Sequence, residues 1–139
     1  MFMLNELLIK ELSNQVETNA SDIQKINDAE VYSTNEIKTN KIWIDGKPIY
    51  RKVFDLGIIP SDGAMTYSTN LNNVSIKKID GYVYDSSDTV VQPINYISQS
   101  STSIIETITI NNGSQIRLRT KGPFTNIKAY VVLEYTKSN

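Results

Sequence analysis

Hydrophobic and polar positions divide the chain into two parts with different repeats. In residues 1–30, apolar side chains recur at alternating steps of three and four, which is the a/d repeat of a coiled coil. The seam consists of Ile9, Val16 and Ile23 at a, and of Leu12, Asn19 and Ile26 at d. A single helix cannot cover this stripe by itself. The repeat therefore predicts a helix over residues 3–28 that pairs with copies of itself, and an amphipathic helix packed on its own domain is the alternative.

The residue types in the seam favour three helices over two. β-branched residues at a, together with Ile26 at d, disfavour a two-stranded coil. Asn19 places a polar group in the seam, which costs stability and fixes register and oligomer number. Three copies would bring three amides around one axis, where they hydrogen-bond to one another, to water or to an anion. A frayed or partly open seam is the alternative for so short a coil.

The heptad repeat ends before residues 31–40, which are rich in Ser, Thr and Asn. These side chains bond their own backbone and favour turns. We expect a short connector here, with at most one brief helical or extended turn.

After residue 40 the apolar residues recur at every second position, as in strands. Predicted strands over residues 41–44 and 47–56 flank Asp45-Gly46, a pair that favours a two-residue hairpin loop. That hairpin would pair Ile42 with Ile49.

Further short strands follow at regular spacing. They are predicted over residues 74–79 and 82–84, joined by a hairpin at Asp80-Gly81, and over residues 90–92, 94–97, 104–110, 115–119 and 129–136. For the pair 104–110 and 115–119 we expect a three-residue loop, Asn111-Asn112-Gly113, which pairs Ile108 with Ile116. Polar loops are expected over residues 61–73, 85–89 and 98–103.

Seven to nine strands with no helix after residue 40 predict a mainly β fold. We expect an antiparallel, jelly-roll-like β-sandwich over residues 41–139, following a trimeric coiled coil over residues 1–30.

Composition excludes several classes of function. With no Cys and no His, the chain has no thiolate or imidazole metal ligands, no disulfides and no Ser-His-Asp triad. A net charge of −1 provides no basic excess for nucleic acid. No apolar run reaches the roughly 20 residues that span a bilayer, so membrane insertion is not expected. We expect neither a metal nor a cofactor.

Enzymatic activity is disfavoured because the only acid–base groups are carboxylates, Lys and Tyr. Paired carboxylates can cleave a glycoside, but many of those present are in predicted turns. Asp85 and Asp88 lie in a Ser-rich turn and lack the full set of calcium ligands, so a solvated turn is the simpler interpretation. The sequence thus predicts a non-enzymatic protein.

Tyrosine is the residue type that best suits sugar contacts and interfaces, and the chain has eight. Tyr82 and Tyr84 share one strand face opposite Val83, and this face is either the outer surface or the buried one. Tyr67 and Tyr96 lie in or beside polar loops.

Two basic residues are further ligand candidates. Arg117 and Arg119 project from one face of a predicted strand, where they either contact an anionic glycan or keep the exposed face soluble.

Three segments resemble known proteins. Residues 31–36 (Val-Tyr-Ser-Thr-Asn-Glu) and 41–52 (Lys-Ile-Trp-Ile-Asp-Gly-Lys-Pro-Ile-Tyr-Arg-Lys) resemble the start of the C-terminal head domain of tail-fibre or receptor-binding proteins from phages of Gram-positive bacteria. Residues 129–137 are similar to the final strand of these proteins. The resemblance implies a homotrimer in the virion, in contact with other virion proteins, that attaches to the host cell. The resemblance does not identify the ligand, and our leading hypothesis is a cell-surface carbohydrate such as a wall teichoic acid or capsule polymer.

Two other functions remain open at this stage. One is a purely structural virion component, such as a head fibre, a decoration protein or a baseplate plug. The other is a depolymerase acting on wall polymers.

Overall fold

The computed structural model describes residues 2–98 and 103–138. The chain forms two compact units, Met1–Val31 and Tyr32–Asn139. The first contains one helix and the second contains two antiparallel sheets, so the fold is mainly β with an N-terminal helix, as expected.

The helical unit consists of α1, Phe2–Ala29, which confirms the predicted helix and extends it by one residue at each end. Its surface carries interactions between neighbouring turns, such as the Gln24 Nε2 bond to Asp28 Oδ1 at 2.8 Å. The apolar seam side chains are uncovered in the single chain, with exposed fractions from 53% for Ile26 to 65% for Ile9.

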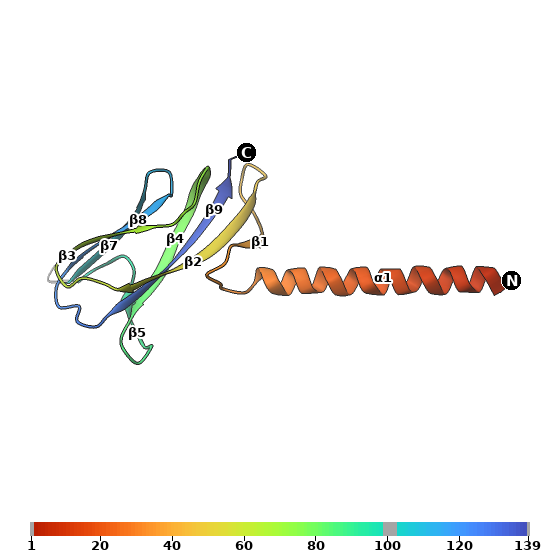
Figure 1. The fold of residues 1–139 in the computed structure, drawn as a ribbon, viewed down its shortest axis with the longest axis horizontal. Coiled ribbons are helices and arrows are strands. Elements are labelled where there is room, and N and C mark those ends of the chain that lie inside the picture. The colour runs from red at the N-terminus through yellow and green to blue at the C-terminus, as the bar shows by residue number, and fades with distance from the viewer. Residues whose placement is uncertain (1, 99–102, 139) are drawn as a thin grey trace. The chain divides into compact units, whose positions relative to one another are not determined.

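The described residues of the second unit form nine strands. The strands lie in two sheets (Figure 1). Their bounds are β1 Ile37–Ile42, β2 Pro48–Ile58, β3 Gly63–Ser68, β4 Val74–Tyr84, β5 Val90–Pro93, β6 Tyr96–Ile97, β7 Ile104–Ile110, β8 Gln115–Lys121 and β9 Lys128–Lys137. One sheet has the order β1-β2-β9-β4-β5 and the other β3-β8-β7-β6. Because β9 pairs with β2 and β4, the end of the chain completes the centre of the larger sheet.

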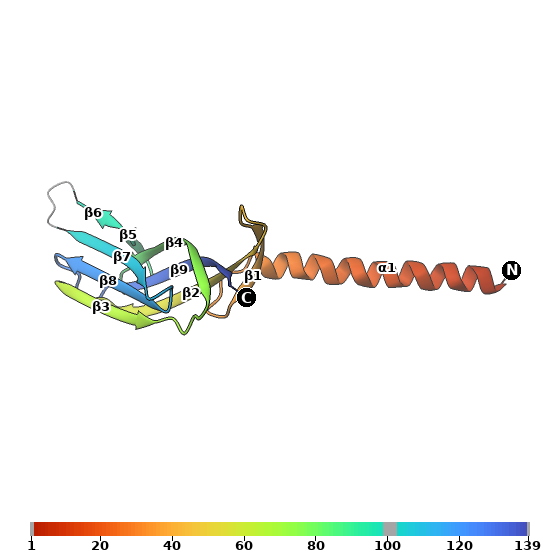
Figure 2. The ribbon, with the colours of Figure 1, turned by 90° about the horizontal axis from the view of Figure 1, so that it is seen from above.

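The hydrophobic core lies between the two sheets, which face each other in Figure 2. The larger sheet contributes Phe54 and alternate residues of β9, and the smaller sheet contributes Ile105, Ile116 and Leu118. Phe54 meets Tyr67 of β3 edge to face, with ring centroids 6.1 Å apart. Burial of these apolar faces is the main force that holds the sheets together.

The first hairpin differs from its prediction by one residue of register. Ile42 pairs with Pro48, not with Ile49. The Trp43 N–H donates to the Lys47 carbonyl at 2.9 Å, which leaves a three-residue loop that ends on Gly46 with φ +85°. Ile49 is buried outside the core cluster that lies between the sheets, and Ile42 is 69% exposed.

The 104–121 hairpin also differs from its prediction. Ile110 pairs with Gln115, so the loop has four residues and Ile108 lies opposite Arg117. This register buries Thr107, whose hydroxyl donates to the Ile94 carbonyl at 3.1 Å. A threonine can face the core here because its hydroxyl has a partner, and Ile108 is left 41% exposed.

Three element boundaries also differ from prediction. β1 begins at Ile37, within the predicted connector, and β3 lies within the predicted loop 61–73. β4 runs without interruption through Asp80-Gly81, where a hairpin was expected. Gly81 adopts φ +140° and packs against the backbone of β9, so it allows close approach between strands and makes no turn.

Candidate functional site

The outer face of the five-stranded sheet carries the candidate site, and the alternation of side chains determines its position. In β9 the core-facing residues are Ala129, Val131, Leu133 and Tyr135, all fully buried. Tyr130 therefore points to the opposite face. In β4 Val83 is fully buried, which turns Tyr82 and Tyr84 outward. The structure thus decides between the two orientations that the sequence left open.

Strand register brings these outward residues together. Tyr82 lies opposite Tyr130, and Asp80 lies opposite Val132. The rings of Tyr84 and Tyr130 meet edge to face, with centroids 5.4 Å apart and an interplanar angle of 80°. The centre of this face is therefore aromatic, with one carboxylate beside it.

A fourth tyrosine comes from the segment before β1. The Tyr32 ring lies against the Arg51 guanidinium, with Arg51 Cζ 4.5 Å from the ring centroid. The segment is attached to the sheet by the carbonyl of Ser33, which accepts a hydrogen bond from the Val53 N–H at 2.9 Å. Tyr32 itself is 68% exposed.

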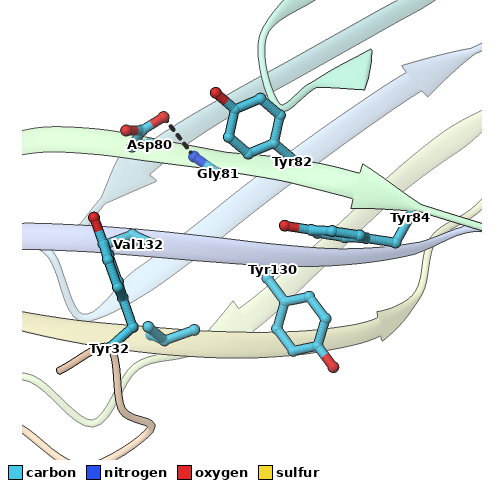
Figure 3. A pocket seen from close by; sticks show the side chains of 8 residues that line it. Tyr32, Asp80, Gly81, Tyr82, Tyr84, Tyr130 and Val132 are labelled. Carbon is cyan, nitrogen blue, oxygen red and sulfur yellow. Dashed lines mark hydrogen bonds between the residues drawn. The ribbon is translucent and has the colours of Figure 1, made fainter. Parts of the chain in front are cut away.

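The side chains on this face surround a depression of about 290 Å³, which we call the tyrosine depression. It is lined by Tyr32, Val53, Asp80, Gly81, Tyr82, Tyr84, Tyr130 and Val132. Figure 3 shows Tyr32 on one side of it, Tyr84 and Tyr130 on the other, and Asp80 and Tyr82 on β4. Apolar rings with polar tips and a few convergent polar groups are typical of small-ligand sites.

Asp80 is the one charged residue in this lining. Its Oδ1 accepts a hydrogen bond from the Gly81 N–H at 2.8 Å, and its Oδ2 lies 3.6 Å from Lys78 Nζ at the surface. The bond to Gly81 holds the carboxylate at the edge of the depression. A carboxylate has several lone-pair sites, so it can accept further hydrogen bonds from a ligand.

Lys128 lies beside the depression but is already paired. Its ammonium forms an ion pair with Asp88, and the hydrogen bond to Asp88 raises the pKa of Lys128 above its ordinary value. The same ammonium is 5.7 Å from the centroid of the Tyr130 ring. Asp88 belongs to the predicted turn 85–89, so this turn is linked to the edge of the candidate site.

A second polar cluster ties the segment before β1 to β9. Glu36 accepts hydrogen bonds from the hydroxyl of Tyr135 and from the ammonium of Lys137, both at 2.5 Å. The Tyr135 ring stacks on that of Tyr50, with centroids 6.2 Å apart. Burial raises the pKa of Glu36, but the bonds from Lys137 and Tyr135 outweigh it and hold this pKa below its ordinary value of 4.5.

This cluster predicts a pH dependence of stability. Because the folded-state pKa of Glu36 is lowered, its contribution is fully present above about pH 4.5 and is lost as the pH falls through the folded value. We expect Glu36→Gln to destabilise the protein at pH 7 and to destabilise it less at pH 3, because the contribution of Glu36 decreases below about pH 4.5. Urea unfolding of both proteins at the two pH values measures this, with Tyr135→Phe as a variant that removes one bond only. An equal difference at both pH values would contradict the prediction.

The remaining predicted ligand residues lie elsewhere. Tyr67 is in β3, not in a loop, and its half-buried ring packs on the core. Tyr96 is in β6 and lines a separate depression of about 510 Å³ in the other sheet, with Ile104 and Glu106. The structure therefore brings Tyr82 and Tyr84 together and separates them from Tyr67 and Tyr96.

Arg117 and Arg119 project from the outer face of the four-stranded sheet, as their strand alternation predicted. Arg119 lies 3.8 Å from the carboxylate of Glu106 in an exposed ion pair. These arginines and the tyrosine depression thus lie on different sheets.

The predicted loops are partly described. The 85–89 turn is confirmed: Asp85 Oδ1 accepts hydrogen bonds from the N–H groups of Ser87 and Thr89 at 2.8 and 3.0 Å. Loop 98–103 falls mostly outside the described residues, since 99–102 are not among them.

The predicted seam residues Ile9, Leu12, Val16, Asn19, Ile23 and Ile26 all lie on α1 and are exposed in the single chain. Their role in a trimer stays a prediction, because one chain contains no partner helix.

Sequence reasoning missed Tyr32, Tyr130 and Asp80. The outward orientation of Tyr130 could have been predicted, because this residue alternates with the apolar residues of the last predicted strand. Asp80 falls in the predicted hairpin loop Asp80-Gly81, and Tyr32 falls in the predicted connector. No local pattern indicates that these residues meet, since Tyr32 and Tyr130 are 98 positions apart.

Within the described residues, no three His, Cys, Asp or Glu side chains cluster as ligands for a metal ion. The same part of the chain contains no helix long and apolar enough to cross a membrane.

In comparisons with known proteins, no family model matches this chain, and neither does any curated protein or solved structure.

Proposed function

We propose that this chain is a non-enzymatic fibre or receptor-binding protein of a phage virion, which forms a homotrimer and attaches to carbohydrate on the host cell surface. The observation that carries the proposal is the combination of two features. One is a separate helical unit with an uncovered apolar seam, and the other is a β unit with an aromatic depression on its outer face.

The seam supports self-association. Five apolar side chains, Ile9, Leu12, Val16, Ile23 and Ile26, are more than half exposed although they recur at a and d positions. Burying them against two copies of the same helix removes this apolar surface from water. Most of the stability of a protein helix comes from packing of its apolar face, so association would also stabilise the secondary structure of α1.

The β unit suits a head domain carried on such a coil. We assign it to the jelly-roll-like sandwiches, because strands distant in sequence pair in both sheets: β2 with β9, and β3 with β8. Three heads on one coil would present three weak sites together, and this raises avidity without a tight single contact.

A second candidate function is a purely structural virion component that is anchored by its coil. It is favoured by Leu4 and Leu7, which are 61% and 58% exposed and fall at heptad positions c and f, outside the seam. A trimeric coil would leave both exposed, so they suit contact with another virion protein.

The test is the native mass of the whole chain together with its binding to cells. We expect a mass near 47 kDa, which corresponds to three chains of 15.7 kDa each. We also expect the protein to be retained on intact cells of the bacterium that the phage infects. A trimer that does not bind these cells would favour the structural component. A native mass near 16 kDa would reject the trimer.

A further inference from the structure

We infer that the tyrosine depression binds one unit of a neutral, hydroxyl-rich sugar polymer, and that Asp80 accepts hydrogen bonds from its hydroxyl groups. The inference rests on the proposed attachment function and narrows it to one site and one class of ligand. It separates neutral polysaccharides from phosphate-bearing polymers such as teichoic acids.

The aromatic lining matches the apolar faces of a sugar ring. A pyranose presents C–H groups on its faces and hydroxyls around its edge, and tyrosine offers a flat apolar face with a hydroxyl at its tip. Tyr32 and Tyr82 are 68% and 42% exposed, so their rings are open to a ligand. Tyr84 and Tyr130 support each other edge to face and form one side of the depression.

Asp80 determines which polar groups the ligand must carry. An ionised carboxylate only accepts hydrogen bonds. The Gly81 N–H uses one lone-pair site of Oδ1, and Lys78 approaches Oδ2 only to 3.6 Å. Sugar hydroxyls donate hydrogen bonds and fit this acceptor, whereas a phosphodiester brings only acceptors and a like charge.

The cations near the depression are already engaged. Lys128 pairs with Asp88, and Lys78 pairs with Asp80 itself. Arg51 is buried and its guanidinium lies against Tyr32. The lining therefore contains one carboxylate, which is paired with Lys78, and no basic side chain. This suits a neutral ligand, because an anionic one would find no cation in the lining to pair with.

The other sheet provides a natural comparison. Its outer face carries Arg117 and Arg119, where an anionic polymer would bind if the arginines were the recognition residues. Variants on the two faces thus separate the two classes of ligand.

The experiment measures retention of the full-length protein on cell-wall polysaccharide from the bacterium that the phage infects. The competing probes are glucose, galactose, rhamnose, N-acetylglucosamine and N-acetylgalactosamine, with glycerol 3-phosphate at matched ionic strength. We expect at least one neutral sugar to release the protein and glycerol 3-phosphate to leave it bound. Retention should change less than about two-fold between 50 and 500 mM salt, because no net charge pairing is involved.

Two variants test the residues. Tyr82→Ala removes an exposed ring and Asp80→Asn removes the charge but keeps an oxygen for the Gly81 N–H. Each is expected to weaken retention about ten-fold or more, in line with the loss of a stacked ring or of a hydrogen bond to a charged group. Tyr82→Phe should retain most binding. Arg117→Ala, an exposed change on the other sheet, is the matched control and should bind as the wild type does. Circular dichroism confirms that each variant is folded.

The outcomes separate the site from the wider function. If the wild type binds cells but Arg117→Ala abolishes retention while Tyr82→Ala does not, the tyrosine depression is not the site. Release by glycerol 3-phosphate or by salt would overturn the neutral ligand. Absence of any cell binding by the wild type would instead reject the attachment function itself.

Discussion

Val16→Asp is expected to convert the proposed trimer of about 47 kDa into single chains of 15.7 kDa. Val16 lies at a central a position and is 60% exposed in the single chain, so association would bury three copies of it around one axis. Three carboxylates there would each lose their hydration without a partner, at a cost of several kcal/mol per charge. Sedimentation equilibrium measures the mass.

The same variant should lose helical signal and cell binding together. Most of the stability of a protein helix comes from packing of its apolar face, so α1 without its partners should show reduced helicity by far-ultraviolet circular dichroism. If attachment depends on three joined heads, retention on cells should fall by about 10²–10⁴-fold. Ser21→Asp adds the same charge at an outer f position and should leave mass and binding unchanged. Equal masses for both variants would show that the seam does not hold the copies together.

Gly81→Ala is expected to destabilise the β unit by about 2–5 kcal/mol, which combines overpacking and backbone strain. A Cβ at Gly81 would lie 2.1 Å from the Tyr130 carbonyl oxygen, and its φ of +140° is one that side-chain-bearing residues rarely adopt. Backbone cannot give way as a flexible side chain does, so β4 and β9 would separate. Because the stability of a domain is typically 5–15 kcal/mol, this is a large part of the total.

Urea unfolding monitored by the fluorescence of Trp43, the one tryptophan in the chain, measures the change. Gly57→Ala is the control: Gly57 has a φ of +70°, but its Cβ would meet nothing within 4 Å. Gly57→Ala should lower the free energy of unfolding only by the backbone strain, which is about 1–2 kcal/mol. Similar midpoints for the two variants would mean that close contact between β4 and β9 does not require glycine.

The two incorrect hairpin registers have a common physical origin. Loop residues such as Asp45-Gly46 and Asn112-Gly113 favour several loop lengths, and a shift of one residue reverses which side chains face the core. The buried face of the 104–110 strand includes Thr107, which local hydrophobicity would place outside. Its bond to the Ile94 carbonyl, from a segment 13 residues away, makes the buried position acceptable.

What the sequence by itself determined is the helical or extended character of the chain and, for β9, which residues share one face. The three–four repeat specified α1, and alternation placed Val131, Leu133 and Tyr135 on one face of β9, because these periods follow directly from backbone geometry. Only the tertiary structure decided which outward residues share a site. Tyr32, Asp80 and Tyr130 come together because β9 inserts between β2 and β4, and such long-range pairing leaves no local trace in the chain.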